Sequence, residues 1–96
     1  MEYRRFGRTE LRMPVISCGG MRFQQGYNPD EPITDASQRN VEACVRHALE
    51  LGINHIETAR GYGSSELQLG KILPQLPRDQ IIVQTKIAPM EDVKQF

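Results

Sequence analysis

The sequence predicts an α/β fold in which an opening β-hairpin is followed by a β-α-β-α-β run. Three observations lead to this prediction. Short apolar runs alternate with amphipathic stretches of helical period, the connections between them are short, and a Gly7-Arg8 pair divides the N-terminal segment. Alternation with short connections favours a parallel sheet covered by helices. With 96 residues, the chain amounts to at most one small domain.

The first elements are a hairpin and a short strand. We expect the hairpin over Tyr3 to Met13, with Gly7-Arg8 at its turn. Val15 to Gly19 is an apolar run that predicts the first strand of the parallel sheet. The next stretch, from Met21 to Thr34, contains two prolines, a glycine, an asparagine and an aspartate, which indicates a loop.

A helix follows the loop. Its apolar residues recur at i, i+3, i+4, i+7 and i+8 and form one stripe: Val41, Cys44, Val45, Ala48 and Leu49. Thr34 or Asp35 can cap the start of this helix, and Gly52 suits the left-handed residue after its end.

Two strands and a second helix complete the order. Ile53 to Glu57 predicts the second strand, and Gln80 to Lys86 predicts the third. Between them, Ser65 and Gln68 have the spacing of a capping box, so we expect a helix that begins there and ends at Pro74.

Composition narrows the class of protein. The 12 basic and 12 acidic residues cancel, and without a basic excess nucleic-acid binding lacks its main driving force. No apolar run approaches a membrane span, and the charged N-terminus is unlike a signal peptide, so we expect a cytoplasmic protein without membrane contact. Cys18 and Cys44 are expected to be buried free thiols rather than a disulfide, and no metal site is expected.

Three polar residues fall at strand ends in a pattern that suits proton transfer. Glu57 ends the second strand, Tyr62 follows five residues later, and Lys86 ends the third strand. A nearby ammonium favours the phenolate and so helps a phenol to give up its proton, while a carboxylate keeps that ammonium charged and oriented. Each residue alone has an ordinary alternative. Tyr62 can cap the rim of the sheet, Lys86 can be solvated, and Glu57 can pair with Arg60 on the surface.

The motifs around these residues resemble the aldo-keto reductases. The resemblance covers essentially the whole chain and is most specific in Glu-Thr-Ala-x-x-Tyr-Gly-x-Ser-Glu-x-x-Leu-Gly, which begins at Glu57. It also includes Cys-Gly-Gly-Met-Arg from Cys18, Glu-Leu-Gly-Ile-Asn from Glu50, and Gln-Thr-Lys from Gln84. The resemblance implies a (β/α)₈ TIM barrel of which residues 1–96 are the N-terminal third, an incomplete domain whose hairpin closes the bottom of the barrel.

The resemblance also implies an activity and a set of site residues. The activity is the reduction of aldehydes or ketones, small-molecule carbonyl substrates, by hydride transfer from NADPH. Tyr62 would donate the proton, Lys86 would assist its release, and Glu57 would take the acidic position that pairs with the lysine. The residues beside the nicotinamide and its ribose would be Gly20, Met21 and Arg22, together with Glu57.

Two departures from the family pattern qualify these expectations. The family's usual acid at position 57 is aspartate, and this chain has glutamate, which moves the carboxylate by roughly one bond length. The family's histidine of the fourth strand and its late basic residues for the 2′-phosphate of NADP have no counterpart within the 96 residues. We therefore expect the isolated chain to be inactive and to associate through uncovered sheet edges. The alternative function is a non-catalytic, cofactor-binding regulatory subunit of the same fold.

Overall fold

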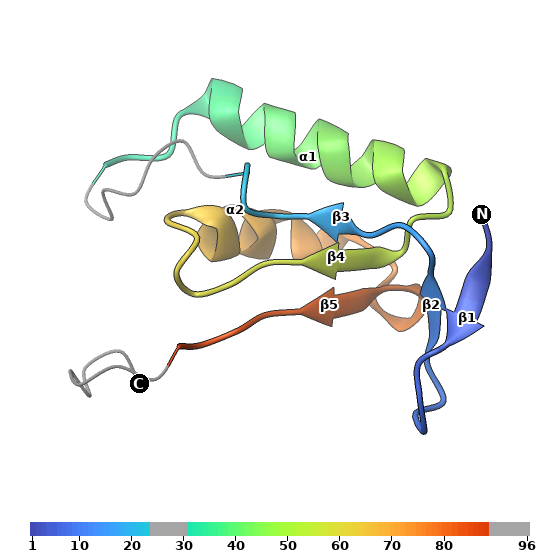
Figure 1. Cartoon of the computed structure of the whole chain (residues 1–96). Helices are drawn as coiled ribbons and strands as arrows, with labels where there is room; N and C mark the ends of the chain where they lie inside the picture. The colour runs from blue at the N-terminus through green and yellow to red at the C-terminus, as the bar shows by residue number, and fades with distance from the viewer. Residues whose placement is uncertain (24–30, 89–96) are drawn as a thin grey trace.

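The computed structural model describes residues 1–23 and 31–88. Its main sheet has three parallel strands in the order β3 (Cys18–Gly19), β4 (His55–Glu57) and β5 (Ile82–Gln84). The helices are α1 (Asp35–Glu50) and α2 (Ser65–Ile72), and the 3₁₀ turns η1 (Leu73–Gln75) and η2 (Arg78–Gln80) lead from α2 to β5. The predicted β-α-β-α-β order and parallel sheet are thus confirmed (Figure 1).

The predicted hairpin forms a separate two-stranded sheet. Strands β1 (Tyr3–Arg5) and β2 (Arg12–Pro14) pair antiparallel, and Gly7 takes a positive φ of 58° in the connection. The hairpin lies at the end of the main sheet where its three strands begin (Figure 1). Tyr3 fixes it there, because its hydroxyl donates to the carbonyl of Gly52 over 2.7 Å.

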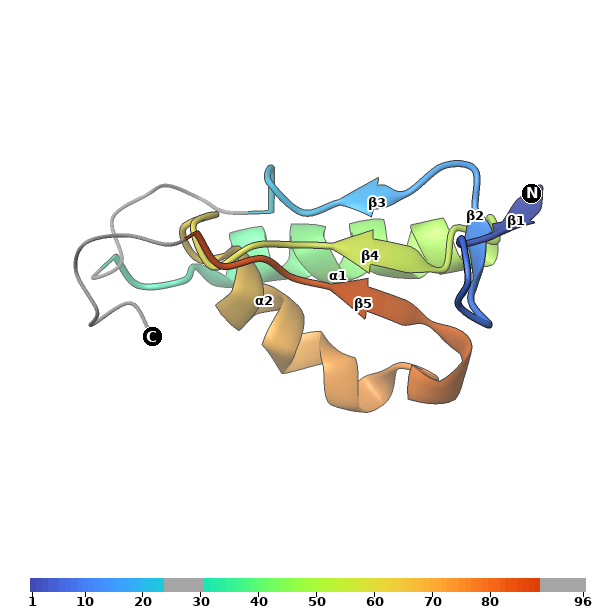
Figure 2. The ribbon, with the colours of Figure 1, turned by 60° about the horizontal axis from the view of Figure 1, so that its bottom comes forward.

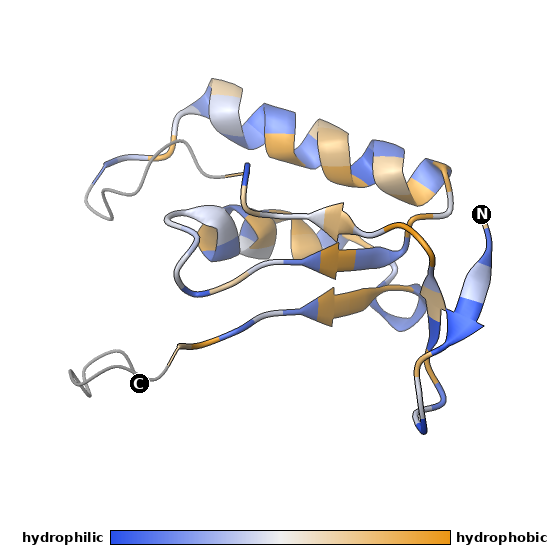
Figure 3. Ribbon diagram, viewed as in Figure 1, coloured by the Kyte–Doolittle hydropathy of each residue, from blue (hydrophilic) through white to orange (hydrophobic). Residues whose placement is uncertain are grey.

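Helix α1 follows its predicted pattern closely. Thr34 is the N-cap, and its side-chain oxygen accepts from the amide of Ser37. Leu51 is the C-cap, and Gly52 behind it has a φ of 84°, as the left-handed stop requires. The helix alternates polar and apolar residues along its length (Figure 3), and it buries Val41, Val45 and Ala48.

Helix α2 begins one residue earlier than a Ser65 capping box would require. Ser64 is the N-cap and makes no side-chain capping bond, and its hydroxyl donates instead to the side chain of Gln68 over 2.5 Å. Ser65 lies inside the helix with its hydroxyl bonded to the Gly20 carbonyl. The predicted capping box is therefore wrong, because a tertiary partner engages the hydroxyl of Ser65. Pro74 falls in η1 just after the helix, as expected.

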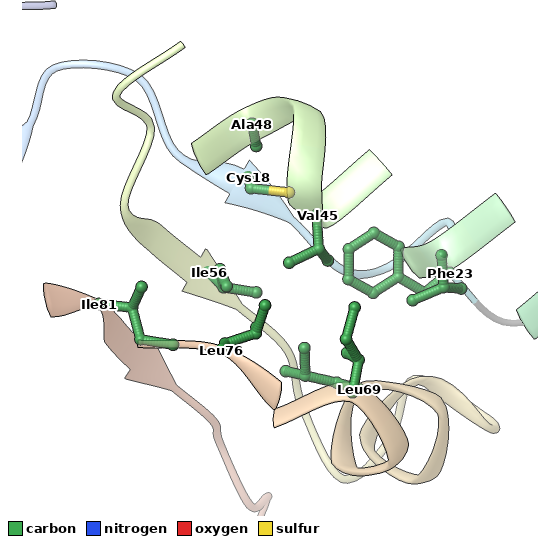
Figure 4. Close-up of a cluster of buried hydrophobic side chains, with 10 residues drawn as sticks. Cys18, Phe23, Val45, Ala48, Ile56, Leu69, Leu76 and Ile81 are labelled. Atoms are coloured by element: carbon green, nitrogen blue, oxygen red, sulfur yellow. The ribbon is translucent and has the colours of Figure 1, made fainter. Parts of the chain in front are cut away.

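Both helices cover one face of the main sheet (Figures 1 and 2). The core lies between them: Ile56 of β4 is completely buried and packs with side chains of β3, α1 and α2 (Figure 4). Residues next to Ile56 point the other way, because successive side chains of a strand alternate between faces. The face away from the helices therefore carries His55 and Glu57.

Several smaller expectations need adjustment. Strand β3 covers only Cys18–Gly19 of the predicted Val15–Gly19 run, and Val15 and Ile16 are exposed. Cys18 is buried, but Cys44 is exposed, so the expectation of two buried thiols is wrong for Cys44. The predicted loop from residue 21 to 34 lies partly outside the described residues. Within the described part of the chain, no helix is long and apolar enough to cross a membrane.

Candidate active site

The three predicted site residues meet at the end of the sheet where β4 and β5 finish. Glu57 is the last residue of β4, and the parallel register places it opposite Gln84, the last residue of β5. Lys86 follows two residues after Gln84, and its carbonyl accepts a hydrogen bond from the amide of Arg60. Tyr62 lies in the short connection between β4 and α2. The carboxyl ends of parallel strands are where barrel enzymes build their sites.

Glu57 is the centre of this cluster. Its Oε2 accepts the Lys86 ammonium over 2.6 Å and the Tyr62 hydroxyl over 3.0 Å. Its Oε1 accepts the backbone amide of Gly20 over 3.1 Å. The Lys86 Nζ also lies 5.1 Å from the centre of the Tyr62 ring and donates to the carbonyl of Thr58 over 2.9 Å. The alternative pairing of Glu57 with Arg60 is not the one that the structure shows, since Lys86 is the partner.

These contacts decide the charges of the cluster. Partial burial works against ionisation of Glu57, but the hydrogen bonds from Lys86, Gly20 and Tyr62 outweigh it, and the pKa of Glu57 lies below its ordinary value. The hydrogen bond to Glu57 is the largest influence on Lys86 and raises the pKa of its ammonium, against a smaller opposing effect of burial. At neutral pH the two residues therefore form an ion pair.

The residues expected beside a cofactor lie next to this cluster. Gly20 is buried, and its carbonyl accepts the amide of Phe23 over 3.0 Å, which closes a turn. Met21 and Arg22 are the two central residues of that turn, and both are exposed. The turn therefore exposes Met21 and Arg22 to solvent at the end of β3, while the amide of Gly20 is hydrogen-bonded to Glu57.

Two groups of polar residues near the site were not predicted from the sequence to belong to it. His55 is buried and bridges the Ser17 hydroxyl, at 2.6 Å, and the Gln84 side chain, at 3.0 Å. Its place two residues before Glu57 was a usable signal, because strand alternation puts both on one face. Thr58 and Ser65 are also buried, and their hydroxyls lie 2.7 Å apart. No spacing rule indicates that pair.

The sequence matches one protein family and several of its known members. The model of the aldo/keto reductase family matches residues 15–95. L-glyceraldehyde 3-phosphate reductase of Escherichia coli K12 is 36% identical over 93 residues, which cover 90% of this chain and 25% of that protein. An E. coli K12 protein named NADH-specific methylglyoxal reductase is 46% identical over 50 residues, covering 47% of this chain and 15% of that protein.

A solved structure gives the same result for the fold. A Pseudomonas aeruginosa protein described as an aldo-keto reductase superimposes with a TM-score of 0.71 at 32% identity, covering 90% of this chain and 33% of its own. The chain thus spans about a quarter of the length of the first curated relative and a third of this structure. Its strands and helices are consistent with the N-terminal part of the TIM barrel that this class of enzyme adopts. The chain belongs to the aldo/keto reductase family.

Proposed function

We propose that the protein carrying this chain reduces an aldehyde or ketone to an alcohol, with NADPH as hydride donor and Tyr62 as proton donor. Membership of the family makes an oxidoreductase role the starting point. The observation that carries the finer proposal is the contact of a phenol, an ammonium and a carboxylate at one strand end: Tyr62 and Lys86 both bond to Oε2 of Glu57.

The phenol, ammonium and carboxylate of this cluster suit a reaction with a nicotinamide cofactor, because hydride transfer to a carbonyl also requires a proton donor. When bound, the cofactor supplies a hydride to the carbonyl carbon, and the carbonyl oxygen then needs a proton. Tyr62 would provide that proton, and Lys86, whose Nζ lies 5.1 Å from the centre of the Tyr62 ring, would stabilise the negative charge that remains on the phenol oxygen. Gly20, Met21 and Arg22 would hold the cofactor, because their turn stands beside Glu57 and exposes two of its side chains.

Glu57 has two effects on this chemistry that oppose each other. It keeps Lys86 charged and fixed in position, which favours proton release from Tyr62. It also accepts the hydrogen of the Tyr62 hydroxyl, so that hydroxyl must turn away from the carboxylate before it can donate to a substrate. Lys86 limits this cost, because it shares the same carboxylate oxygen and neutralises its charge.

Substitution of Tyr62 by phenylalanine tests the proposal. In the full-length gene product, Tyr62→Phe should lower kcat for carbonyl reduction by about 10²- to 10⁴-fold, the usual contribution of a general acid. The affinity for NADPH should stay unchanged. Tyr3→Phe is the matched control, because Tyr3 bonds to Gly52 at the opposite end of the sheet. Carbonyl reduction at the wild-type rate by Tyr62→Phe would show that another group is the acid.

The choice of cofactor is tested in the same assay. We expect a lower KM for NADPH than for NADH, and the reverse order would identify an NADH enzyme.

A second candidate function follows from the hydrogen bond between Tyr62 and Glu57. If the hydroxyl stays on the carboxylate, the site binds a nicotinamide cofactor without turning over, as a regulatory subunit would. Tight NADPH binding by the wild-type protein, with no oxidation of NADPH over a panel of aldehydes and ketones, would favour this function over the enzyme.

A further inference from the structure

The turn formed by Gly20 to Phe23 is held to the rest of the site at both polar atoms of Gly20. The amide of Gly20 donates to Oε1 of Glu57 over 3.1 Å. The carbonyl of Gly20 accepts the hydroxyl of Ser65 over 2.8 Å, in addition to the amide of Phe23 that closes the turn. One bond thus comes from Glu57 at the end of β4. The other comes from Ser65, the first residue of α2, which lies 45 residues after Gly20 in the sequence.

The hydroxyl of Ser65 is itself held by Thr58. The two oxygens are 2.7 Å apart, and both side chains are buried, with exposed fractions of 0% for Ser65 and 3% for Thr58. Ser65 has a single hydroxyl hydrogen, which it donates to Gly20, so Thr58 must be the donor between the two hydroxyls. The result is a directed chain from Thr58 to Ser65 to the Gly20 carbonyl, in which each bond strengthens the next.

The backbone contacts of the same two residues reach the proton-donor group. The Thr58 carbonyl accepts the ammonium of Lys86 over 2.9 Å. The Ser65 amide donates to the carbonyl of Tyr62 over 2.9 Å. Thr58 and Ser65 therefore connect two parts of the site: the turn at the end of β3, and the segments that carry Tyr62 and Lys86.

Close packing makes the turn sensitive to these bonds. A Cβ atom on Gly20 would overlap the backbone carbonyl oxygen of Glu57 and would lie 3.1 Å from Oγ of Ser65. The turn thus rests directly on β4 and on the hydroxyl of Ser65, with no side chain between them. Removal of that hydroxyl leaves a gap beside the Gly20 carbonyl and a buried Thr58 hydroxyl without its acceptor.

We propose that Ser65, oriented by Thr58, is a positioning residue that sets the Gly20–Phe23 turn at the distance from Tyr62 and Lys86 that cofactor binding requires. This inference rests on the proposed function, since it takes the turn as part of the nicotinamide site. Neither hydroxyl touches a reacting atom. The effect of losing them therefore falls on the affinity for cofactor and on the exchange of turn amides.

The test compares variants of the full-length gene product by the fluorescence of bound NADPH. Ser65→Ala should raise the Kd for NADPH about tenfold, as expected for one buried hydrogen bond with its partner left unsatisfied. Its kcat at saturating cofactor and the pH profile of kcat should stay at wild-type values. Ser64→Ala is the matched control, because the hydroxyl of Ser64, the N-cap of α2, bonds among the described residues to Gln68 and not to the turn, and its Kd should not change.

Thr58 provides a second, independent pair of variants. Thr58→Val keeps the shape of the side chain and removes the donor, and should raise the Kd by about threefold, since Ser65 still donates to Gly20. Thr58→Ser keeps the donor and should bind NADPH as the wild type does. If Ser65→Ala fails to fold, this pair decides the question alone.

The outcomes separate the positioning role from the proposed function. A wild-type Kd in Ser65→Ala and Thr58→Val, even with a lowered Tm, would mean that the hydroxyls only stabilise the fold. A wild-type protein that binds no NADPH would overturn the proposed function, and with it the cofactor role of the turn. Faster hydrogen exchange of the Phe23 amide in Ser65→Ala would then still show that Ser65 holds the turn.

Discussion

At the scale of single residues, Glu57 decides how the site is charged. One carboxylate oxygen accepts both Lys86 and Tyr62, and the other accepts the Gly20 amide. The extra methylene of glutamate relative to the family's usual aspartate gives the carboxylate a longer reach from β4. In this chain the acid thus links Tyr62, the proposed proton donor, to the turn after β3, in addition to pairing with the lysine.

The ion pair between Glu57 and Lys86 predicts a defined pH dependence. The lowered pKa of Glu57 contributes stability that is present above its ordinary value and lost as the pH falls through its folded value. The raised pKa of Lys86 contributes stability that is present below its ordinary value and lost as the pH rises through its folded value. The pair is therefore fully effective between about pH 5 and pH 10.

Glu57→Gln tests this pH dependence. The variant should lower the pKa of Lys86 toward its ordinary value, because the carboxylate that raises it is gone. The loss of stability at neutral pH should stay within about 1 kcal/mol, since both side chains are partly exposed. NMR titration of ¹³C-methylated Lys86 measures the first effect, and urea unfolding at several pH values measures the second. A Lys86 titration identical to that of the wild type would contradict the assignment.

At the scale of elements, the sequence predicts what local rules determine. The period of Val41, Val45 and Ala48, with Thr34 before them and Gly52 after them, is sufficient for α1, because each of these signals acts within a few residues. The strand-end position of Glu57 follows equally from the predicted order of strands, whereas Lys86, predicted as the last residue of the third strand, lies two residues beyond the end of β5.

What the sequence does not predict depends on contacts between distant residues. Ser65 has the spacing of a capping residue, yet Gly20 accepts its hydroxyl. Cys44 belongs to the apolar stripe of α1, yet it is exposed, at a pocket that it lines together with Gly19 and Phe23. The bond from Tyr62 to Glu57 likewise depends on how the loop after β4 folds back, which no motif spacing specifies.

The substitution of glycine by alanine should have opposite effects on stability within α2 and just after the end of α1. Gly70 lies in α2, and a Cβ atom there would meet nothing within 4 Å. Gly70→Ala should therefore raise the free energy of unfolding by about 0.5–1 kcal/mol, because alanine loses less backbone entropy in a helix. Gly52→Ala should lower it, since Gly52 has a φ of 84° and its Cβ would lie 2.8 Å from the Tyr3 hydroxyl.

Urea unfolding of the two variants beside the wild type measures both changes. A loss of stability in Gly70→Ala would mean that another part of the protein packs closely against this position of α2.

At the scale of the whole molecule, the described sheet has two open edges. Strands β3 and β5 each pair only with β4 among the described residues, so one side of each strand has no backbone partner there. Large apolar side chains are also exposed in α2 and in the connections between elements: Val15, Ile16, Leu51, Leu67 and Ile87. Unpaired strand edges beside exposed apolar groups are the usual route to association between chains.

A polypeptide of residues 1–96 produced alone should therefore associate. Eleven of the described residues are buried hydrophobic side chains of its core, and a chain of this size buries a smaller share of its surface than a full barrel does. We expect sedimentation velocity to show oligomers that grow with concentration, and thermal unfolding to be broad.

A variant at the open edge of β5 provides the control. Substitution of Val83 by lysine would reduce core packing as well as strand pairing, so the sharper control is Thr85→Pro, which removes a backbone amide just beyond β5. This variant should associate less if β5 supplies the edge. A sharp melting transition of a monomer in the unsubstituted polypeptide would instead show that the three strands and two helices form a stable unit by themselves.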